Sequence, residues 1–370
     1  MERPSPVHVT RPVLPPLEEV LPLLQEIWQS RMLSNGGPIL QRFEAALGAY
    51  LGVEHLSLVT NATLGLILAL RHLGVRGEVV TTPFSFIATA HAIRWAGAEP
   101  VFADIDPVTL NLDPAAVAAR ITPRTGAILA VHCYGRPCDT AALAAVAAAH
   151  RLPLVYDAAH AFAVRDAAGP LCAAGDLSVL SFHATKVFNT FEGGAIVAPD
   201  REAKLALDRL ANYGILDEER VLATGFNAKM SEINAAMGLA LLPHADAAIA
   251  ARARVAQRYA AALAGVAGLR CLFPEPVPGH NHYAFPVLLG PGYPLPREAL
   301  LERLRAQGIF ARRYFHPLIS DQPMYRDLPS AAPEGLPVAR AAAAGILCLP
   351  LHPDLAEADQ DRVIAVLRGA

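Results

Sequence analysis

Lys186 is the first residue whose chemistry is unusual for its context. It lies in the stretch Ser181-Phe182-His183-Ala184-Thr185-Lys186. Of the 31 Lys and Arg residues only three are lysines, so arginine fills nearly all basic positions. A lysine amine can lose its proton and form a Schiff base, whereas a guanidinium cannot. Lys186 is therefore a candidate nucleophile, and an ordinary surface lysine at a turn is the alternative.

A carboxylate upstream gives this lysine a chemical partner. The apolar run Leu154-Val155-Tyr156 ends in Asp157, and buried strands of open α/β sheets present polar groups to a ligand at such an edge. The two residues match what pyridoxal 5′-phosphate requires, because a lysine holds its aldehyde and a carboxylate keeps its pyridine nitrogen protonated. Each residue alone has an ordinary structural explanation, and the pair favours the cofactor.

Two further segments give weaker signals of a ligand site. A strand over Leu56–Thr60 leads into Asn61-Ala62-Thr63 at the start of a helix, which is an arrangement that binds phosphate. The same residues also fit a plain helix N-cap. Phe86 follows a turn and could lie at a pocket mouth, although an aromatic residue there more often belongs to the core.

Short apolar strands alternate with helices along most of the chain, which predicts a parallel or mostly parallel sheet with helices on both faces. We expect strands at 56–60, 78–81, 99–103, 126–132, 152–156, 177–182 and 195–198. Pro243 is expected to kink a long helical region that ends near residue 263. We expect an N-terminal segment over 1–30, a large cofactor-binding domain over 31–245 and a smaller α+β domain over 246–370.

Composition limits the possible partners and compartment. The 370 residues carry a net charge of −3 with both signs interspersed, which argues against nucleic acid or an anionic membrane as the main partner. No uninterrupted apolar run reaches the roughly 18 residues needed to span a bilayer. Without a signal-peptide core we expect a cytoplasmic protein. The five cysteines lack zinc spacing, so we expect reduced thiols and no metal site.

With these motifs in place, the sequence resembles the DegT/DnrJ/EryC1/StrS family of sugar aminotransferases, which are fold-type I pyridoxal phosphate enzymes. The resemblance runs from about residue 30 to the C-terminus. It implies an α/β fold in which a mostly parallel seven-stranded sheet lies between helices, followed by a smaller C-terminal α+β domain. The motifs that carry it, in order, are Asn35-Gly36-Gly37, Thr60-Asn61-Ala62-Thr63, Phe84-Ser85-Phe86-Ile87-Ala88-Thr89, Asp157-Ala158-Ala159-His160-Ala161, Ser181-Phe182-His183-Ala184-Thr185-Lys186, Glu192-Gly193-Gly194 and Phe226-Asn227-Ala228-Lys229-Met230-Ser231-Glu232.

The resemblance also implies a role for each matching residue. Lys186 corresponds to the Schiff-base lysine and Asp157 to the carboxylate at the pyridine nitrogen. His160 corresponds to the residue near that carboxylate and the ring, and Phe86 to the aromatic stacked on the ring. The residues that match the phosphate-binding positions are Ala62, Thr63, Ser181 and Asn227. Asn227 would reach across from the neighbouring subunit, which implies a homodimer with shared sites. Asn61 departs from the family, which usually has Gly or Ser there.

The expected reaction transfers the amino group of L-glutamate to a keto sugar carried on a nucleotide. The Ser-Phe-His-x-x-Lys form is similar to enzymes that act at C4 of a 4-keto-6-deoxy sugar nucleotide, which favours dTDP-4-keto-6-deoxyglucose. His183 could then contact the sugar or the proton path, or be a structural histidine. Tyr314 and His316 could meet the nucleotide-sugar or form a solvated strand end. A 3-keto sugar or cyclitol acceptor, a sugar dehydratase and a non-catalytic regulator remain alternatives.

Overall fold

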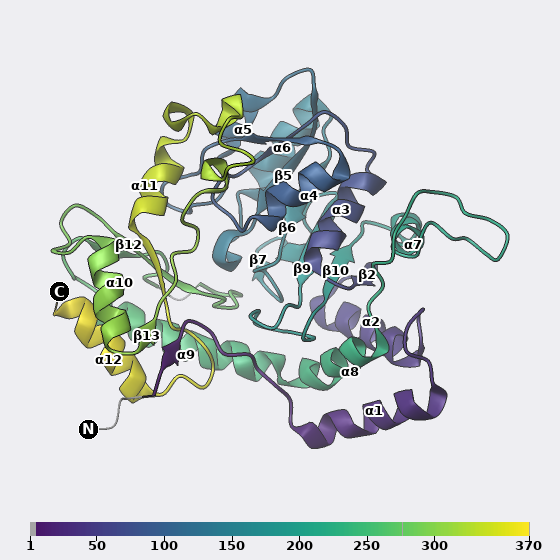
Figure 1. The fold of residues 1–370 in the computed structure, drawn as a ribbon, viewed down its shortest axis with the longest axis horizontal. Coiled ribbons are helices and arrows are strands. Elements are labelled where there is room, and N and C mark those ends of the chain that lie inside the picture. The colour runs from purple at the N-terminus through teal and green to yellow at the C-terminus, as the bar shows by residue number, and fades with distance from the viewer. Residues whose placement is uncertain (1–4, 276, 370) are drawn as a thin grey trace.

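A seven-stranded sheet forms the centre of the molecule (Figure 1), and the computed structural model describes residues 5–275 and 277–369. Its strands, in spatial order, are β2 (Leu56–Val59), β10 (Gly194–Val197), β9 (Leu177–Ser181), β6 (Leu154–Asp157), β5 (Thr125–Val131), β3 (Glu78–Thr81) and β4 (Glu99–Phe102). Only β10 runs antiparallel to its two neighbours in this sheet, and the other described pairs are parallel. The expected mostly parallel seven-stranded sheet is therefore confirmed.

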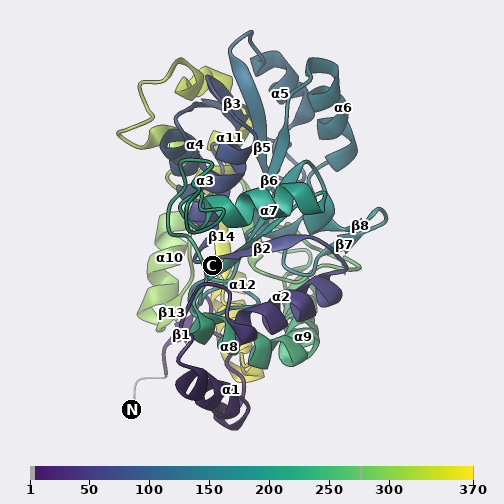
Figure 2. The same cartoon turned by 90° about the vertical axis from the view of Figure 1, so that its right-hand side faces the viewer.

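Helices cover both faces of the sheet, because successive strand residues point to opposite sides. Val79 of β3 belongs to the core cluster of one face, together with residues of the helices α3 (Ala62–His72), α4 (Ala88–Ala96) and α7 (Arg201–Leu210). The next residue, Val80, packs under α5 (Pro114–Arg120) and α6 (Thr140–His150) on the other face. Figure 2 shows α3 and α4 on one side of the sheet and α5 and α6 on the other.

Side-chain caps fix where four of these helices begin. Asn61, Asp113, Asp139 and Asp200 each accept a hydrogen bond from a backbone N–H in the first turn of the helix that follows. Such a cap satisfies a donor that has no partner within the helix and stabilises it by about 1 kcal/mol. The caps therefore fix the first residue of each of these helices. They also help to position the polar residues between the strand ends and the helices.

A long helical region links the large sheet to the second half of the molecule. It consists of α8 (Glu232–Leu241), a 3₁₀ turn η3 (Leu242–His244) and α9 (Ala245–Leu263), so the expected break at Pro243 is confirmed. The α8 part packs against α1 (Leu17–Ser30) and α2 (Pro38–Leu51) below the sheet (Figure 1).

This helical region is also long and apolar enough to cross a membrane by length and composition alone. About 50% of its most apolar window is buried inside the molecule. Charged residues such as Asp246 interrupt the region, so it contains no uninterrupted apolar run of about 18 residues.

A smaller antiparallel sheet lies beyond α9. Its strands are β11 (Leu269–Cys271), β12 (Phe285–Leu289) and β14 (Ile346–Leu349). The surrounding helices are α9, α10 (Arg297–Ala306), α11 (Pro337–Gly345) and α12 (Glu357–Arg368). The short strand β13 (Ile309–Phe310) pairs in parallel with β1 (Val7–His8) from the N-terminal segment. A short hairpin, β7 (Arg165–Asp166) with β8 (Gly169–Pro170), completes the described strands. The division at residues 30 and 245 stays a prediction.

Candidate active site

A cavity of about 340 Å³ opens at the carboxyl edge of the large sheet. The segments that follow β2, β3, β6 and β9 all reach it, as expected where parallel strands end together. It brings together most of the residues singled out from the sequence. Its lining includes Ala62, Thr63, Phe86, Asp157, His160, Ser181, His183, Lys186 and Tyr314.

Lys186 lies in a tight turn directly after β9, where its backbone N–H donates to the His183 carbonyl at 2.8 Å. Its Nζ is 3.4 Å from the Tyr283 Oη and 4.8 Å from the centre of that ring. Burial lowers the pKa of Lys186 to about 8, and the charge of Asp157 opposes this shift. A substantial fraction of the amine is therefore neutral near pH 8, and neutral amine is the nucleophilic form.

Asp157 ends β6, is 6% exposed and has two donors. The Thr89 hydroxyl donates to its Oδ2 at 2.8 Å, and the Ala159 N–H donates to its Oδ1 at 3.1 Å. Ser85 Oγ lies 3.0 Å from the Thr89 hydroxyl and extends this chain of hydrogen bonds. Burial raises the pKa of Asp157, whereas the Thr89 hydrogen bond, the Ala159 N–H and the charge of Lys186 oppose the rise. A cationic group facing this carboxyl would stabilise its charged form.

The start of α3 also lines the cavity. In the described part of the chain, the backbone N–H groups of Ala62 and Thr63 donate to no protein acceptor, as is usual in a first helical turn. Asn61 is used as the N-cap, and its Oδ1 accepts from the Leu64 N–H at 2.9 Å. A Cβ at Gly194 would lie only 2.9 Å from the Ala62 nitrogen, so glycine allows β10 to pass this closely. The departure from the family at Asn61 therefore leaves the Ala62 and Thr63 donors free.

His160 is buried and stacks on Tyr283, with ring centres 4.2 Å apart and planes 10° from parallel. Burial lowers the pKa of His160 well below its ordinary value, and the charge of Lys186 adds to this effect. Its Nδ1 accepts from the Tyr134 backbone N–H at 3.2 Å, which assigns the proton of the neutral ring to Nε2.

Two predicted residues stand at the rim of the cavity. Phe86 is 62% exposed, as expected for an aromatic at a pocket mouth rather than in the core. The His183 Nδ1 accepts from the Thr185 N–H at 3.2 Å, and its Nε2 is 3.6 Å from the Glu192 carboxylate. Both Phe86 and His183 leave a face available to a bound molecule.

Two predicted residues do not line this cavity. Asn227 is exposed, and its Oδ1 accepts from Lys229 Nζ at 2.8 Å. His316 is half-buried and does not line the cavity, whereas Tyr314 does. Thr89 and Tyr283 make contacts here that the sequence analysis did not identify. Thr89 stood within a family motif, but nothing local indicated its bond to Asp157.

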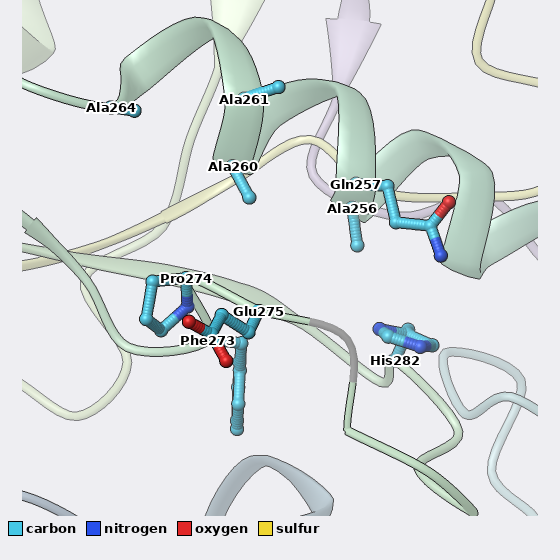
Figure 3. A pocket seen from close by; sticks show the side chains of 9 residues that line it. All are labelled: Ala256, Gln257, Ala260, Ala261, Ala264, Phe273, Pro274, Glu275 and His282. Atoms are coloured by element: carbon cyan, nitrogen blue, oxygen red, sulfur yellow. The ribbon is translucent and has the colours of Figure 1, made fainter.

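A second hollow, of about 300 Å³, lies between α9 and the segment after β11 (Figure 3). Alanine methyl groups of α9 form one wall, and Phe273, Pro274, Glu275 and His282 face them. None of the predicted site residues lies there. Within residues 5–275 and 277–369, no group of three His, Cys, Asp or Glu side chains is placed to hold a metal ion. All five cysteines are unpaired, four of them buried.

The first cavity fits pyridoxal 5′-phosphate in its donor set. It combines a partly neutral amine, a buried carboxylate and free backbone donors at a helix N-terminus, which are the groups suited to an aldehyde, a pyridinium and a phosphate.

Comparison with known proteins gives one consistent result. The chain is 47% identical over 98% of its length to dTDP-4-amino-4,6-dideoxy-D-glucose transaminase from Shigella dysenteriae, covering 99% of that protein. It is 43% identical to the Escherichia coli protein of the same name, covering 98% of each chain. The solved structure of DesI in the presence of its TDP-sugar product matches with a TM-score of 0.93 and 39% identity, over 98% of this chain and 92% of that one. The family model for DegT/DnrJ/EryC1/StrS aminotransferases matches residues 17–368. The chain belongs to the DegT/DnrJ/EryC1/StrS aminotransferase family, whose members depend on pyridoxal 5′-phosphate.

Proposed function

We propose that this aminotransferase moves the amino group of L-glutamate to C4 of a 4-keto-6-deoxy sugar nucleotide, with dTDP-4-keto-6-deoxyglucose as the acceptor. The observation that carries the proposal is the convergence of Lys186, Asp157 and the free N–H groups of α3 on one cavity. The choice of acceptor is supported by the names of the relatives that are 47% and 43% identical.

The cofactor, when bound, supplies an aldehyde that reacts with amines and a ring that withdraws electrons from the attached carbon. Lys186 Nζ would hold the aldehyde, and Asp157 would hold the proton at the ring nitrogen. Ala62, Thr63 and Ser181 would bind the phosphate through backbone and hydroxyl donors. Phe86 would cover one face of the ring, and His160 would lie near the ring and Asp157.

Lys186 would also move the proton. Once its amine is free, it would accept the proton from Cα of the amino donor and deliver it to C4′, the former aldehyde carbon of the cofactor. A pKa of about 8 suits this task, because both forms of the amine are then available near neutral pH. Asp157 stays charged against the ring nitrogen, and burial of the carboxylate strengthens that interaction.

The rim of the cavity would receive the sugar. His183 bears its proton on Nε2, toward Glu192, when Nδ1 accepts from Thr185. This pair and Tyr314 offer both donors and acceptors to the hydroxyl groups of a sugar. His316 would contact the sugar nucleotide only after a local rearrangement, since it lies outside the cavity lining.

We further propose a homodimer in which Asn227 completes the neighbouring subunit's phosphate site. The segment between α7 and α8, which carries Asn227, projects from the body of the subunit (Figure 1). It exposes Val221 (66%) and Leu222 (58%), and α1 exposes Trp28 (70%). Exposed large apolar side chains on these two segments support their association with another protein.

Replacement of Lys186 tests the core of this proposal. We expect Lys186→Ala to lose covalent attachment of the cofactor, read by borohydride reduction and mass mapping, and to lose turnover by several orders of magnitude. Lys186→Arg is the matched control, because it keeps a cation but cannot form the linkage. Normal turnover in either variant would refute the role of Lys186.

The acceptor is tested separately. The purified enzyme is supplied with L-glutamate and either a 3-keto or a 4-keto sugar nucleotide, and the product is examined by NMR. We expect an amine at C4 of the dTDP-linked sugar and formation of 2-oxoglutarate. Amination only at C3, or only of a sugar without a nucleotide, would overturn the acceptor assignment and leave the aminotransferase intact.

A further inference from the structure

Tyr283 lies beside the Lys186 amine, and no local sequence pattern predicted this contact. Its Oη lies 3.4 Å from Nζ, and its ring centre lies 4.8 Å from the same atom. The amine therefore meets both the hydroxyl group and the ring of one side chain. A cation so placed is attracted by the ring.

Two contacts fix the position of this tyrosine, one to its backbone and one to its ring. Asn281, which is 1% exposed, accepts from the Tyr283 N–H at 3.0 Å and donates to the carbonyls of His160 and Phe162 at 2.8 and 2.9 Å. The His160 ring stacks on the tyrosine ring. Asn281 thus joins the segment after β6 to the segment before β12.

Tyr283 also lies in a segment between the cavity that contains Lys186 and the hollow against α9. Its side chain lines the catalytic cavity, whereas the preceding residue, His282, lines the hollow against α9 (Figure 3). The two neighbouring side chains therefore face different spaces, at a point where the backbone of His282 has a left-handed φ of 50°. The tyrosine is therefore directed at Lys186 by the course of the backbone as well as by its ring contacts.

We propose that Tyr283 is a positioning residue that holds the freed Lys186 amine in reach of the reacting carbon in both of its protonation states. The phenol can accept from the ammonium group and can donate to the neutral amine, because its hydroxyl is both donor and acceptor. Burial raises the pKa of Tyr283 well above its usual range, so the phenol keeps its proton throughout. This inference rests on the proposed role of Lys186 and adds the group that orients it.

The two contacts determine the direction in which Tyr283 shifts the pKa of Lys186. A hydrogen bond from an ammonium group is stronger than one to a neutral amine, and the ring attracts only the cation. Tyr283 therefore favours the charged amine and partly offsets the effect of burial. The other ionisable groups that line the cavity near Lys186 are Asp157, His160, His183, Glu192 and Tyr314.

The test measures the pH profile of Lys186 in the cofactor-free protein. Competitive acetylation followed by peptide mass mapping reports the reactivity of each lysine, and Lys204 and Lys229 serve as references in the same sample. We expect a wild-type midpoint near 8 for Lys186. Tyr283→Phe, which keeps the ring and its stack on His160, should lower this midpoint by about half a unit or more. Tyr314→Phe, which removes another hydroxyl from the same cavity, should leave it in place.

The outcomes separate this inference from the proposed function. A lowered Lys186 midpoint with unmoved Lys204 and Lys229 profiles supports the positioning role. An unmoved or raised midpoint in folded Tyr283→Phe protein overturns it, even if Lys186 still attaches the cofactor. Asn281→Ala gives a second measurement, because it frees the Tyr283 backbone without altering the phenol. A downward shift there supports the role, and an unchanged midpoint counts against it.

Discussion

At the scale of single residues, the environment of Asp157 decides whether the carboxyl can stay charged. Desolvation alone would favour the protonated acid, and two donors with one nearby cation oppose it. Of these, the Thr89 hydroxyl is the largest opposing cause and forms the shortest contact, at 2.8 Å. Because Thr89 is fully buried, no solvent molecule readily replaces its hydroxyl.

We predict that Thr89→Val lowers kcat about tenfold to a hundredfold, since a hydrogen bond to a charged group contributes about 1.5–3 kcal/mol. The loss should raise the pKa of Asp157 further and weaken its hold on the proton at the ring nitrogen. Steady-state kinetics and a spectrophotometric pH titration of the bound cofactor measure the two effects. Thr89→Ser keeps the hydroxyl and should retain most activity. A Val variant with wild-type kcat would show that the carboxyl does not depend on this donor.

At the scale of elements, two of the family motifs serve the fold rather than the chemistry. Glu232 of α8 is fully buried, and its two carboxylate oxygens accept from the Ile39 and Leu40 N–H groups at 2.9 and 3.0 Å. It therefore caps α2 from another helix. A Cβ at Gly37 would lie 2.6 Å from the Glu232 carboxyl carbon, which explains the second glycine of Asn35-Gly36-Gly37.

We predict that Glu232→Ala destabilises the cofactor-free protein by about 3 kcal/mol, because two buried N–H groups at a helix N-terminus lose a charged acceptor. Urea unfolding followed by circular dichroism measures this loss. Glu232→Gln retains one acceptor oxygen in a similar shape and should cost less. Equal stability of the wild-type and Ala proteins would exclude the capping role.

Part of the fold and of the site could be predicted from the sequence. Lys186 and Asp157 were identifiable because their chemistry is unusual for their local context, and the strands of the large sheet were identifiable from short apolar runs. Thr89 and Tyr283 were not, because they lie 68 and 97 residues from the groups they contact. The helix α11 was missed because it begins at Pro337 within a proline-rich region. The pairing of β1 with β13 joins chain ends that no local pattern relates.

At the scale of the whole molecule, the cavity of one chain lacks the Asn227 side chain that the family resemblance assigns to it. The backbone of this segment is nevertheless ordered against the sheet, since Thr60 donates to the Ala228 carbonyl at 2.8 Å and Val59 forms a bridge with Lys229. Asn227 is thus anchored close to the start of α3 while its side chain turns away, toward Lys229. The exposed apolar side chains of the α7–α8 segment and of α1 indicate where a second copy would pack.

We predict that mixing Lys186→Ala protein with Asn227→Ala protein restores activity that neither has alone. In a heterodimer, the site that keeps Lys186 would receive Asn227 from the other chain, whereas the second site would carry both lesions. With random exchange of equal amounts, about a quarter of the sites should be intact. Activity is measured after subunit exchange has been established by native mass spectrometry of differently tagged chains. If Asn227 served its own chain, every site that keeps Lys186 would still lack the amide, and exchange would restore nothing. Recovery near a quarter therefore requires the two chains to share each site, and its absence after proven exchange would place Asn227 outside the partner's cavity.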